Sequence, residues 1–322
     1  MDAGQLLARR AITALLLALG AAACSTADYS KPVNDFAAAT GNAKSALTDL
    51  NAEVTAAYRV YLDKSIAKGD LLLTHESNDC EVESDRCRLI VLDKNGENAG
   101  DYPPEPPLTR MTLLMGEIDG YAANLKALLE DNTAQQVEAD VNAALGSIQH
   151  LATTVSELQT PPGAAPADIP QFATPVGEGV NWVLGQYIER VKFKGLQRAT
   201  AEAKPVIRRA ADLFDIASSV AAAPRVEMAN EVAAAQDAAQ TSRDRTGNDA
   251  YAKAAAKFDA LLAEGPPEMF QRMAAAHDAL AESLQGEHMS LATVNARIQD
   301  FAAQAEQLAK ILRDLRALAA QQ

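Results

Sequence analysis

The sequence predicts an all-α fold: an elongated antiparallel helical bundle with coiled-coil-like heptad seams and one small disulfide-closed β-hairpin insertion. Apolar residues recur at alternating steps of three and four over long stretches, which places them along one face of a helix. A single stretch, residues 70–107, breaks this spacing and contains two of the three cysteines. Aromatic residues make up only 5% of the chain and alanine is abundant, so the helices are expected to approach each other closely.

Residues 1–23 have the pattern of a secretory signal. Arg9 and Arg10 precede an apolar run, and the small residues Gly20 to Ala23 end at Cys24. The apolar run of about 13 residues reaches about 20 Å at 1.5 Å per residue, which is short of the roughly 30 Å hydrocarbon core. We therefore expect a segment that is removed after export, not a permanent membrane helix.

The small residues followed by Cys24 and Ser25 resemble the lipobox of bacterial lipoproteins, with Ala21 at the position that most often holds Leu. The resemblance covers about the first 25 residues. It implies that Cys24 carries diacylglycerol and a further acyl chain such as palmitate, which anchors the protein to the bilayer. In a Gram-negative cell, Ser25 in place of Asp would favour the outer membrane, facing the periplasm.

The alternative is cleavage by signal peptidase I after Ala23, which would leave Cys24 as a lone thiol. Cys80 and Cys87 are close enough in the chain to pair, and an oxidising compartment favours the disulfide. That pairing makes Cys24 the odd cysteine. The count therefore favours lipidation.

The charge balance limits which kinds of partner the protein can bind. The chain has 29 basic and 43 acidic residues, for a net charge of −14, and removal of residues 1–23 leaves −15. A nucleic-acid binder needs a basic footprint, so we predict no nucleic acid. Peripheral binding to anionic lipid is disfavoured for the same reason, and the partners expected are the bilayer, through acylated Cys24, and an unknown envelope protein or polymer.

The domain organisation follows from the segments that interrupt the helical pattern. Whether the two helical parts form one bundle or two domains stays open. The expected segments are a signal peptide at 1–23, a lipidated tether at 24–31, a helical half at 32–158 with its insertion at 70–107, a proline-rich linker at 159–174 and a helical half at 175–322.

The first helix is predicted to start with Ser30 as its cap and Pro32 in its first turn. It should end at Lys68 and Gly69, a cation and a glycine at the C-terminus. Its heptad seam comprises Phe36, Thr40, Ala43, Leu47, Leu50, Val54, Ala57 and Tyr61.

The insertion reads as two short strands, Leu71–His75 and Arg88–Leu92. A disulfide between Cys80 and Cys87 would close the acidic loop between them, at about 2–3 kcal/mol by the entropic estimate. Asp93 to Gly96 predicts a turn, and Pro103 to Pro107 an extended spacer.

Later seams predict further helices. One starts at Thr109 and the next seam at Val137, and these could be two helices or one kinked helix. Pro205 is expected to kink or restart a helix. Ser290 should cap the last helix. Alanines on its seam, such as Ala305, and on the seam of the first helix, such as Ala43, favour close packing within one chain over a multimeric rod.

Candidate chemistry is sparse. His75 and the acidic residues after it could attract a cation, but a solvated acidic loop is favoured, because carboxylates without defined spacing bind weakly. His277 and Asp278 are adjacent on a helix and do not face each other. Gly-x-Ser-x-Gly and a glycine-rich phosphate loop do not occur in the sequence. We therefore predict no metal, no cofactor and no catalytic residues.

One local stripe of basic residues contrasts with the net negative charge of the chain. Arg190, Lys194 and Arg198 are spaced by four and share a helix face. They could dock an acidic partner, a lipid headgroup or an envelope polymer. The alternative, which we favour, is a solvated face paired with the chain's own acidic residues. Further basic residues nearby are Lys192, Lys204, Arg208 and Arg209.

These observations predict a non-catalytic, lipid-anchored envelope protein that acts as a structural, scaffolding or binding lipoprotein. The alternative is an exported helical effector. A hairpin at 71–92 on a long helical body resembles, in architecture only, the cytolysin A-like pore-forming toxins. The charged loop argues against membrane insertion, and leucines that cover the end of the bundle explain the hairpin better. A substrate-binding or enzymatic lipoprotein is the weaker third option.

Overall fold

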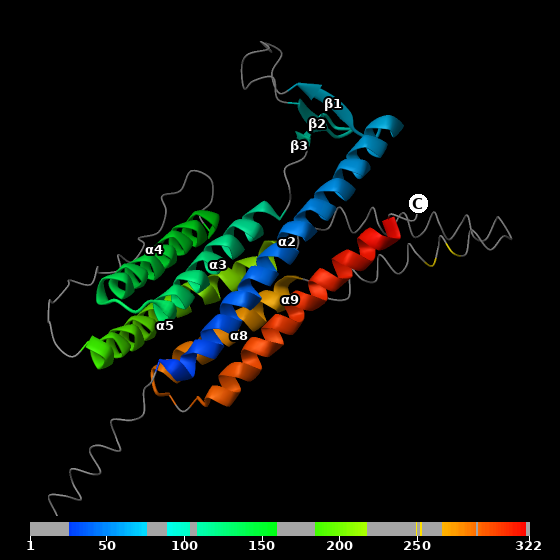
Figure 1. The fold of residues 1–322 in the computed structure, drawn as a ribbon. Coiled ribbons are helices and arrows are strands. Elements are labelled where there is room, and N and C mark those ends of the chain that lie inside the picture. Colours follow the sequence, from blue (N-terminus) through cyan, green and yellow to red (C-terminus); the bar gives the residue numbers. More distant parts are fainter. Residues whose placement is uncertain are drawn as a thin grey trace, which may run out of the picture.

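A computed structural model describes residues 26–75, 89–103, 108–159, 184–217, 249, 252, 266–287 and 289–319. This part of the chain is mostly helical and contains one small antiparallel sheet (Figure 1). The helices are α2 (Ala27–Lys68), α3 (Thr109–Glu130), α4 (Ala134–Gln159), α5 (Leu184–Ala217), α8 (Pro266–Leu284) and α9 (Leu291–Ala319). The strands are β1 (Leu72–His75), β2 (Leu89–Leu92) and β3 (Asn98–Tyr102).

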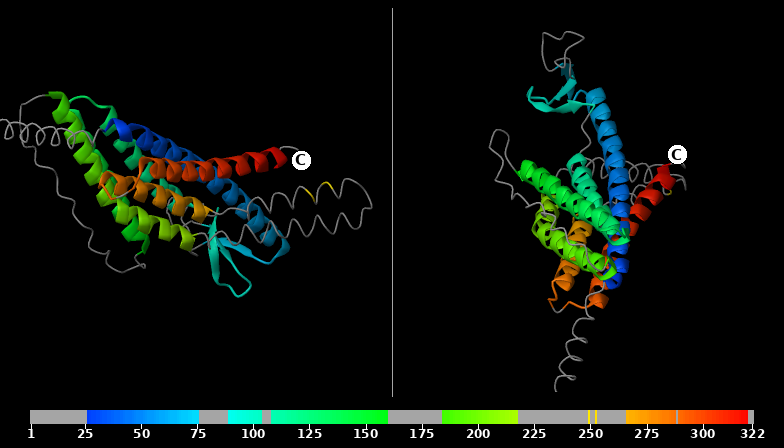
Figure 2. Two further views of the ribbon diagram at one scale, coloured as in Figure 1. Left: turned by 90° about the horizontal axis from the view of Figure 1, so that it is seen from below. Right: turned by 60° about the vertical axis from the view of Figure 1, so that its left-hand side comes forward.

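The six helices form a ring, which we call the body. Each helix packs against the next one along the chain, and α9 returns to pack against α2 (Figure 2). Contacts of α3 with α5 and of α2 with α8 cross the ring. One continuous cluster of buried side chains extends over all six helices, so the two predicted halves share a core.

The helix directions are mixed. Helices α5 and α8 are antiparallel, since Lys204 pairs with Glu282 and Arg208 with Asp278. Helix α8 is also antiparallel to α2, and a tight turn at Gly286 reverses the chain into α9. Helices α2 and α9 therefore run in the same direction, whereas the sequence suggested an antiparallel arrangement throughout.

The predicted seams are confirmed within the body. In α2 the seam residues from Phe36 to Val54 are buried. Beyond Val54 the seam changes, because Leu62 is buried while Tyr61 is only half-buried. The reason is that the end of α2 leaves the ring and meets the sheet instead (Figure 1). Seam residues that are buried in α3, α4 and α9 are Met111, Leu114, Ile118, Tyr121, Leu125, Leu128, Val137, Val141, Ala144, Ile148, Leu151, Val155, Val294, Ile298, Phe301, Ala305, Leu308 and Leu312.

Two predicted helix ends are confirmed. Gly69 follows α2 with a φ of 74°, and its N–H donates to the Ile66 carbonyl. Ser290 caps α9, because its Oγ accepts the N–H of Thr293 at 3.2 Å. The predicted start of α2 is wrong, since the helix begins at Ala27 and includes Ser30 and Pro32.

Two predictions about where helices break can be compared with the structure. Residues 131–133 separate α3 from α4, so these are two helices. Helix α5 continues through Pro205, so the expected restart of the helix is wrong, and the expected kink stays a prediction. Pro205 and Ala201 both lie on the exposed side of α5, where water can hydrate the Ala201 carbonyl that lacks its usual N–H partner.

The sheet has three strands in the order β1-β2-β3, not the two that the sequence predicted. The pairing of β1 with β2 is antiparallel, with Leu73 opposite Val91. The predicted turn at Asp93 is present: its Oδ1 accepts the N–H groups of Asn95 and Glu97. That turn folds the chain back as β3. We call the sheet and residues 58–68 of α2 the tip.

Candidate functional site

Three predicted site residues, Cys24, Cys80 and Cys87, lie outside the described residues, as does most of the predicted linker at 159–174. The lipid anchor and the disulfide therefore stay predictions. The described chain starts at Thr26, two residues after Cys24, and its first contacts define how the helical body begins.

The start of α2 is held by α5 and α8. The buried Thr26 hydroxyl donates to the carboxylate of Glu189 on α5. One turn later, the Tyr29 hydroxyl donates to the Ser283 carbonyl of α8 at 3.0 Å, and the Tyr29 ring meets Phe193 edge-on at 5.9 Å. The body is thus packed from the first turn of its first helix.

The predicted basic stripe on α5 divides into two parts. Arg190 and Lys194 are exposed. Arg198 is half-buried and pairs with Glu202 on its own helix at 2.8 Å. The three residues therefore share a face of α5, but they do not present three equivalent charges to a partner.

Three of the four neighbouring basic residues have partners within the body, although Arg208 itself stays exposed. Lys192 is only 3% exposed and donates to the Leu129 carbonyl at the end of α3. Lys204 pairs with Glu282 at 2.7 Å, and Arg208 with Asp278 at 2.6 Å. Lys204 and Arg208 thus pair with acidic residues of the chain itself, whereas the role of the stripe at Arg190, Lys194 and Arg198 stays a prediction.

A buried polar pair, which sequence reasoning missed, lies at the centre of the body. Tyr121 on α3 and His277 on α8 are both fully buried, and the Tyr121 hydroxyl lies 2.9 Å from His277 Nε2. The ring of Phe36 lies 5.8 Å from that of His277 and 6.1 Å from that of Phe301. A signal was available: Tyr121 is on a predicted apolar seam, and His277 stands among alanines of a helix.

Burial controls the protonation of this pair. It lowers the pKa of His277 to about 3, with smaller contributions from the positive charges of Lys204 and Arg208. Burial likewise raises the pKa of Tyr121 well above its usual value. Both groups are thus neutral near pH 7. Because neither side chain reaches the surface, the pair can join α3 to α8 but cannot touch a substrate.

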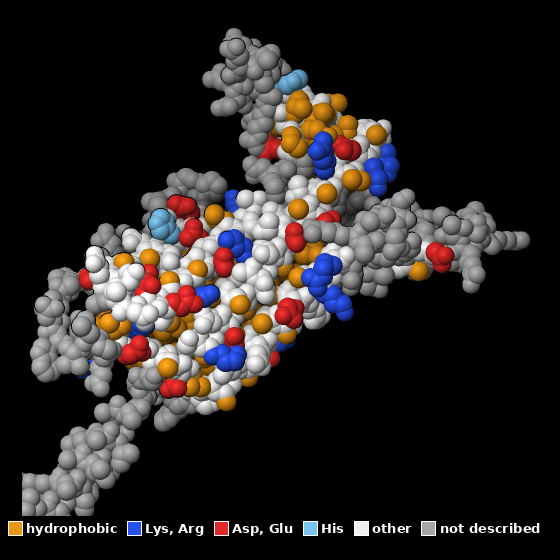
Figure 3. All heavy atoms as spheres, viewed as in Figure 1, with side chains coloured by type: hydrophobic (Ala, Val, Ile, Leu, Met, Phe, Trp, Pro, Cys, Tyr) orange, Lys and Arg blue, Asp and Glu red, His pale blue; other side chains and the backbone are white. Residues whose placement is uncertain are grey.

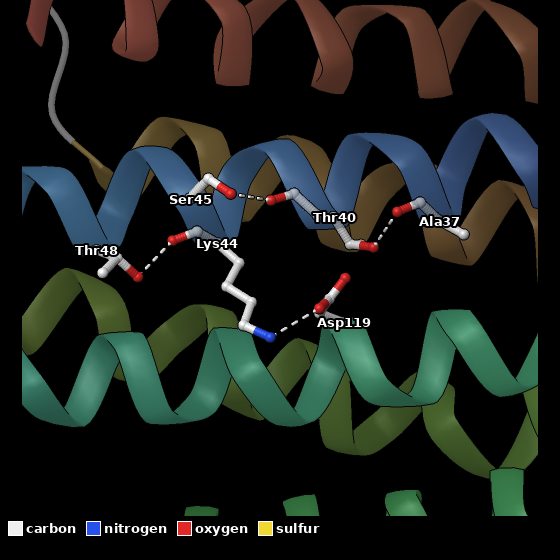
Figure 4. A network of polar contacts seen from close by, with 7 residues as sticks. Ala37, Thr40, Lys44, Ser45, Thr48 and Asp119 are labelled. Atoms are coloured by element: carbon white, nitrogen blue, oxygen red, sulfur yellow. Dashed lines mark hydrogen bonds and ion pairs between the residues drawn. The ribbon is translucent and has the colours of Figure 1, made fainter.

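Polar contacts between α2 and α3 are of the ordinary surface kind (Figure 4). Lys44 crosses from α2 to Asp119 on α3 at 3.0 Å. The hydroxyls of Ser45 and Thr48 instead donate to carbonyls of their own helix. This network joins two helices at their rim and presents no convergent set of catalytic groups.

The tip exposes apolar side chains. Leu72 is 62% exposed and Leu73 is 36% exposed. Hydrophobic side chains gather on the surface where the sheet lies (Figure 3). Val60 at 44% and Leu113 at 51% are the other large apolar residues that are exposed in the described part of the chain.

Within the described ranges, no group of three or more His, Cys, Asp or Glu side chains could hold a metal ion. None of the described helices is both long and apolar enough to cross a membrane.

Comparisons with known proteins found no relative. The chain matches no model of a protein family, and no curated protein or solved structure is significantly similar to it. Any functional proposal therefore rests on the chain's own sequence and structure.

Proposed function

We propose that this protein is a non-catalytic, lipid-anchored envelope protein that acts as a structural, scaffolding or binding lipoprotein. The observation that carries the proposal is the signal-like segment that ends at Cys24. Support comes from the start of α2 at Ala27, three residues later, with its first turn packed against α5 and α8. An acylated Cys24 would then hold a packed body close to the bilayer surface.

The length of α2 would separate the tip from the membrane. Its 42 residues extend about 63 Å at 1.5 Å per residue. If α2 stood upright on the bilayer, the sheet would lie about that far above it. A scaffold or binding protein of this form would present its tip to partners at a distance from the anchoring membrane.

The remaining features of the proposal rest on the sequence. Ser25 favours the periplasmic side of the outer membrane, and the attached chains would include palmitate. Cys80 and Cys87 would form a disulfide that closes the loop beyond β1. The partners would be the bilayer and an envelope protein or polymer, with neither nucleic acid nor cofactor involved. The coiled-coil-like character of the seams also belongs to the proposal.

Labelling tests the anchor. Cells that express the protein are grown with radioactive palmitate, and the purified protein is assayed for label. The wild type should be labelled and Cys24→Ala should not. Cys80→Ala should keep its label and serves as the matched control. An unlabelled wild type would end the lipoprotein proposal.

The second candidate is an effector that uses the 71–92 hairpin against a membrane. The exposure of Leu72 and Leu73 favours it. The strands are only four residues long, whereas a membrane-spanning strand needs about 9–11 residues. Release of a trapped dye from liposomes by the delipidated protein would support this candidate, and intact liposomes at micromolar protein would exclude it.

A further inference from the structure

The two edges of the sheet differ in how readily a further strand could pair with them. The outer strand β3 carries Asp101 and is followed by Pro103, which lacks an N–H group. Its register with β2 is irregular at Leu92, and the N–H of Gly100 donates to the side chain of Asn98. Charges, prolines and bulges are the devices that keep foreign strands from pairing with an edge.

Within its four residues, the opposite edge, β1, has none of these devices, although Glu76 follows it directly in the sequence. Its residues are Leu72, Leu73, Thr74 and His75, without an Asp, Glu, Lys, Arg, Pro or Gly. It pairs with β2 in regular register on one side. Among the described residues, no strand lies on its other side.

Strand β1 is also exposed on both faces. Successive residues of a strand point to opposite sides of the sheet. Leu72, 62% exposed, therefore lies on one face and Leu73, 36% exposed, on the other. A partner that covers both must reach around the edge of the sheet.

We propose that β1 is a docking edge for an extended peptide segment of another protein, which adds to the sheet as a fourth strand. Such a segment would satisfy the outward backbone groups of β1 and bury Leu72 and Leu73 on its two faces. The segment would be rich in uncharged β-branched and aromatic residues. It would contain no acidic residues, because the chain carries a net charge of −14.

Two other occupants fit less well. A second copy would bring two strongly acidic chains, each with a net charge of −14, together at this edge. A bilayer cannot pair with the backbone groups of a strand edge. The inference rests on the proposed binding role but not on the lipid at Cys24, so it is tested with the unlipidated full-length Cys24→Ala protein.

The probe is a phage library of random peptides about twelve residues long, which exceeds the length of β1 and of most natural strands. The library is selected on immobilised Cys24→Ala protein, and an enriched peptide is synthesised with a fluorophore. We expect enriched peptides to be uncharged or basic and rich in Val, Ile, Tyr or Phe. Leu72→Lys or Leu73→Lys should weaken peptide binding at least tenfold, about 1.4 kcal/mol.

Val60→Lys and Leu113→Lys are the matched controls. These two residues are exposed to a similar degree but lie on α2 and α3, so peptide binding should change less than twofold. All four residues are exposed, and an unchanged thermal unfolding midpoint for each variant will show that it still folds.

The peptide itself supplies a test that does not depend on any variant of the protein. An added strand uses the N–H groups of alternate residues. N-methylation of one alternate set should abolish binding, while methylation of the other set should leave it within twofold.

Four outcomes would overturn the proposal. They are an absence of enriched peptides, binding that is insensitive to lysine at positions 72 and 73, equal effects of the two N-methylated sets, and self-association of the protein that Leu72→Lys removes. The last would identify a second copy as the occupant. None of these results bears on palmitate labelling at Cys24, so failure of the edge and failure of the anchor are distinguishable.

Discussion

The body and the tip differ in how many of their apolar side chains are buried. In the body, six helices share one continuous apolar core with Phe36, Tyr121, His277 and Phe301 at its centre. In the tip, β1 has no buried residue at all. The sheet contributes two buried side chains, Ile90 and Val91, and a two- or three-stranded sheet is marginal without such packing.

This difference implies unequal local stability. Segments with few buried apolar contacts open at a small fraction of the global free energy of unfolding. The tip is therefore expected to open without the body, and the body to unfold as a unit. A surface that is only lightly packed is also one that can accept a partner strand without breaking a core.

The largest expected difference is in truncation of apolar side chains. Phe36→Ala should lower the free energy of unfolding by about 3–5 kcal/mol, because the fully buried ring leaves a cavity between α2, α8 and α9. Leu72→Ala in the tip should change it by less than about 0.5 kcal/mol. Urea unfolding followed by helix circular dichroism measures both. Similar losses for the two variants would contradict the difference in burial between body and tip.

The next effect is the acid sensitivity of the body. The pKa of His277 is about 3, below its usual 6.5, so the unfolded chain binds the proton more tightly. The stabilisation from this site is complete above pH 6.5 and is lost as the pH falls toward 3. By 1.36 kcal/mol per unit, the loss is about 3–5 kcal/mol. Urea midpoints measured between pH 7 and pH 4 give the slope.

Variants of the buried pair separate titration from packing. His277→Leu alone leaves the Tyr121 hydroxyl buried without its partner, which should cost about 1–3 kcal/mol at pH 7. Adding Tyr121→Phe should recover part of that loss and remove the His277 contribution to the pH slope. A double variant with an unchanged slope would assign the acid sensitivity to other groups.

A third difference concerns how closely the helices approach. A Cβ added at Gly195 on α5 would collide with the Val141 side chain of α4, and Leu128 lies 3.5 Å away. Gly195→Ala should therefore destabilise by about 1–3 kcal/mol. Gly146→Ala on α4 has no atom within 4 Å of the new methyl group and should stabilise by about 0.5–1 kcal/mol. Thermal unfolding midpoints compare the two, and equal signs would contradict the close packing of α4 and α5.

The body was largely predictable from sequence because its apolar residues recur with the period of a helix. Steps of three and four located the buried faces of α2, α3, α4 and α9, and Gly69 and Ser290 marked helix ends. Local patterns carry no information on which helices meet. Neither the parallel course of α2 and α9 nor the meeting of Tyr121 with His277, 156 positions apart, could be read from them.

The tip was harder to predict. Strand β3 has the sequence Asn-Ala-Gly-Asp-Tyr, which lacks the β-branched residues that mark a strand. It forms because the turn at Asp93 returns the chain to β2, so tertiary pairing overrides weak propensity. For the basic stripe, the spacing predicted a common face, but only the structure reveals that Lys192 is buried against α3 and that Lys204 and Arg208 pair with α8.

The smallest expected effect concerns two carboxyl groups, one in the body and one at the tip, whose pKa values are shifted in opposite directions. Partial burial, and then the neighbouring carboxyl of Asp131, raise the pKa of Asp140 to about 6. The folded state therefore binds this proton more tightly, and stability falls as the pH rises from 4 to 6. Asp140→Asn should stabilise at pH 7 by less than about 1 kcal/mol, since the group is largely solvated and screened. It should have little effect at pH 4.

At the tip the sign reverses. A hydrogen bond from Lys94 holds the pKa of the exposed Asp70 below its usual value. Asp70→Asn should therefore weaken the junction of α2 with the sheet at pH 7 and lose that effect as the pH falls below 4. Amide exchange at Leu92 and Asp93 measures the junction directly. If Asp70→Asn changes amide exchange at the tip without shifting the global unfolding transition, the tip is a separate folding unit. A shift of the global transition would show instead that the tip is a cooperative part of the body.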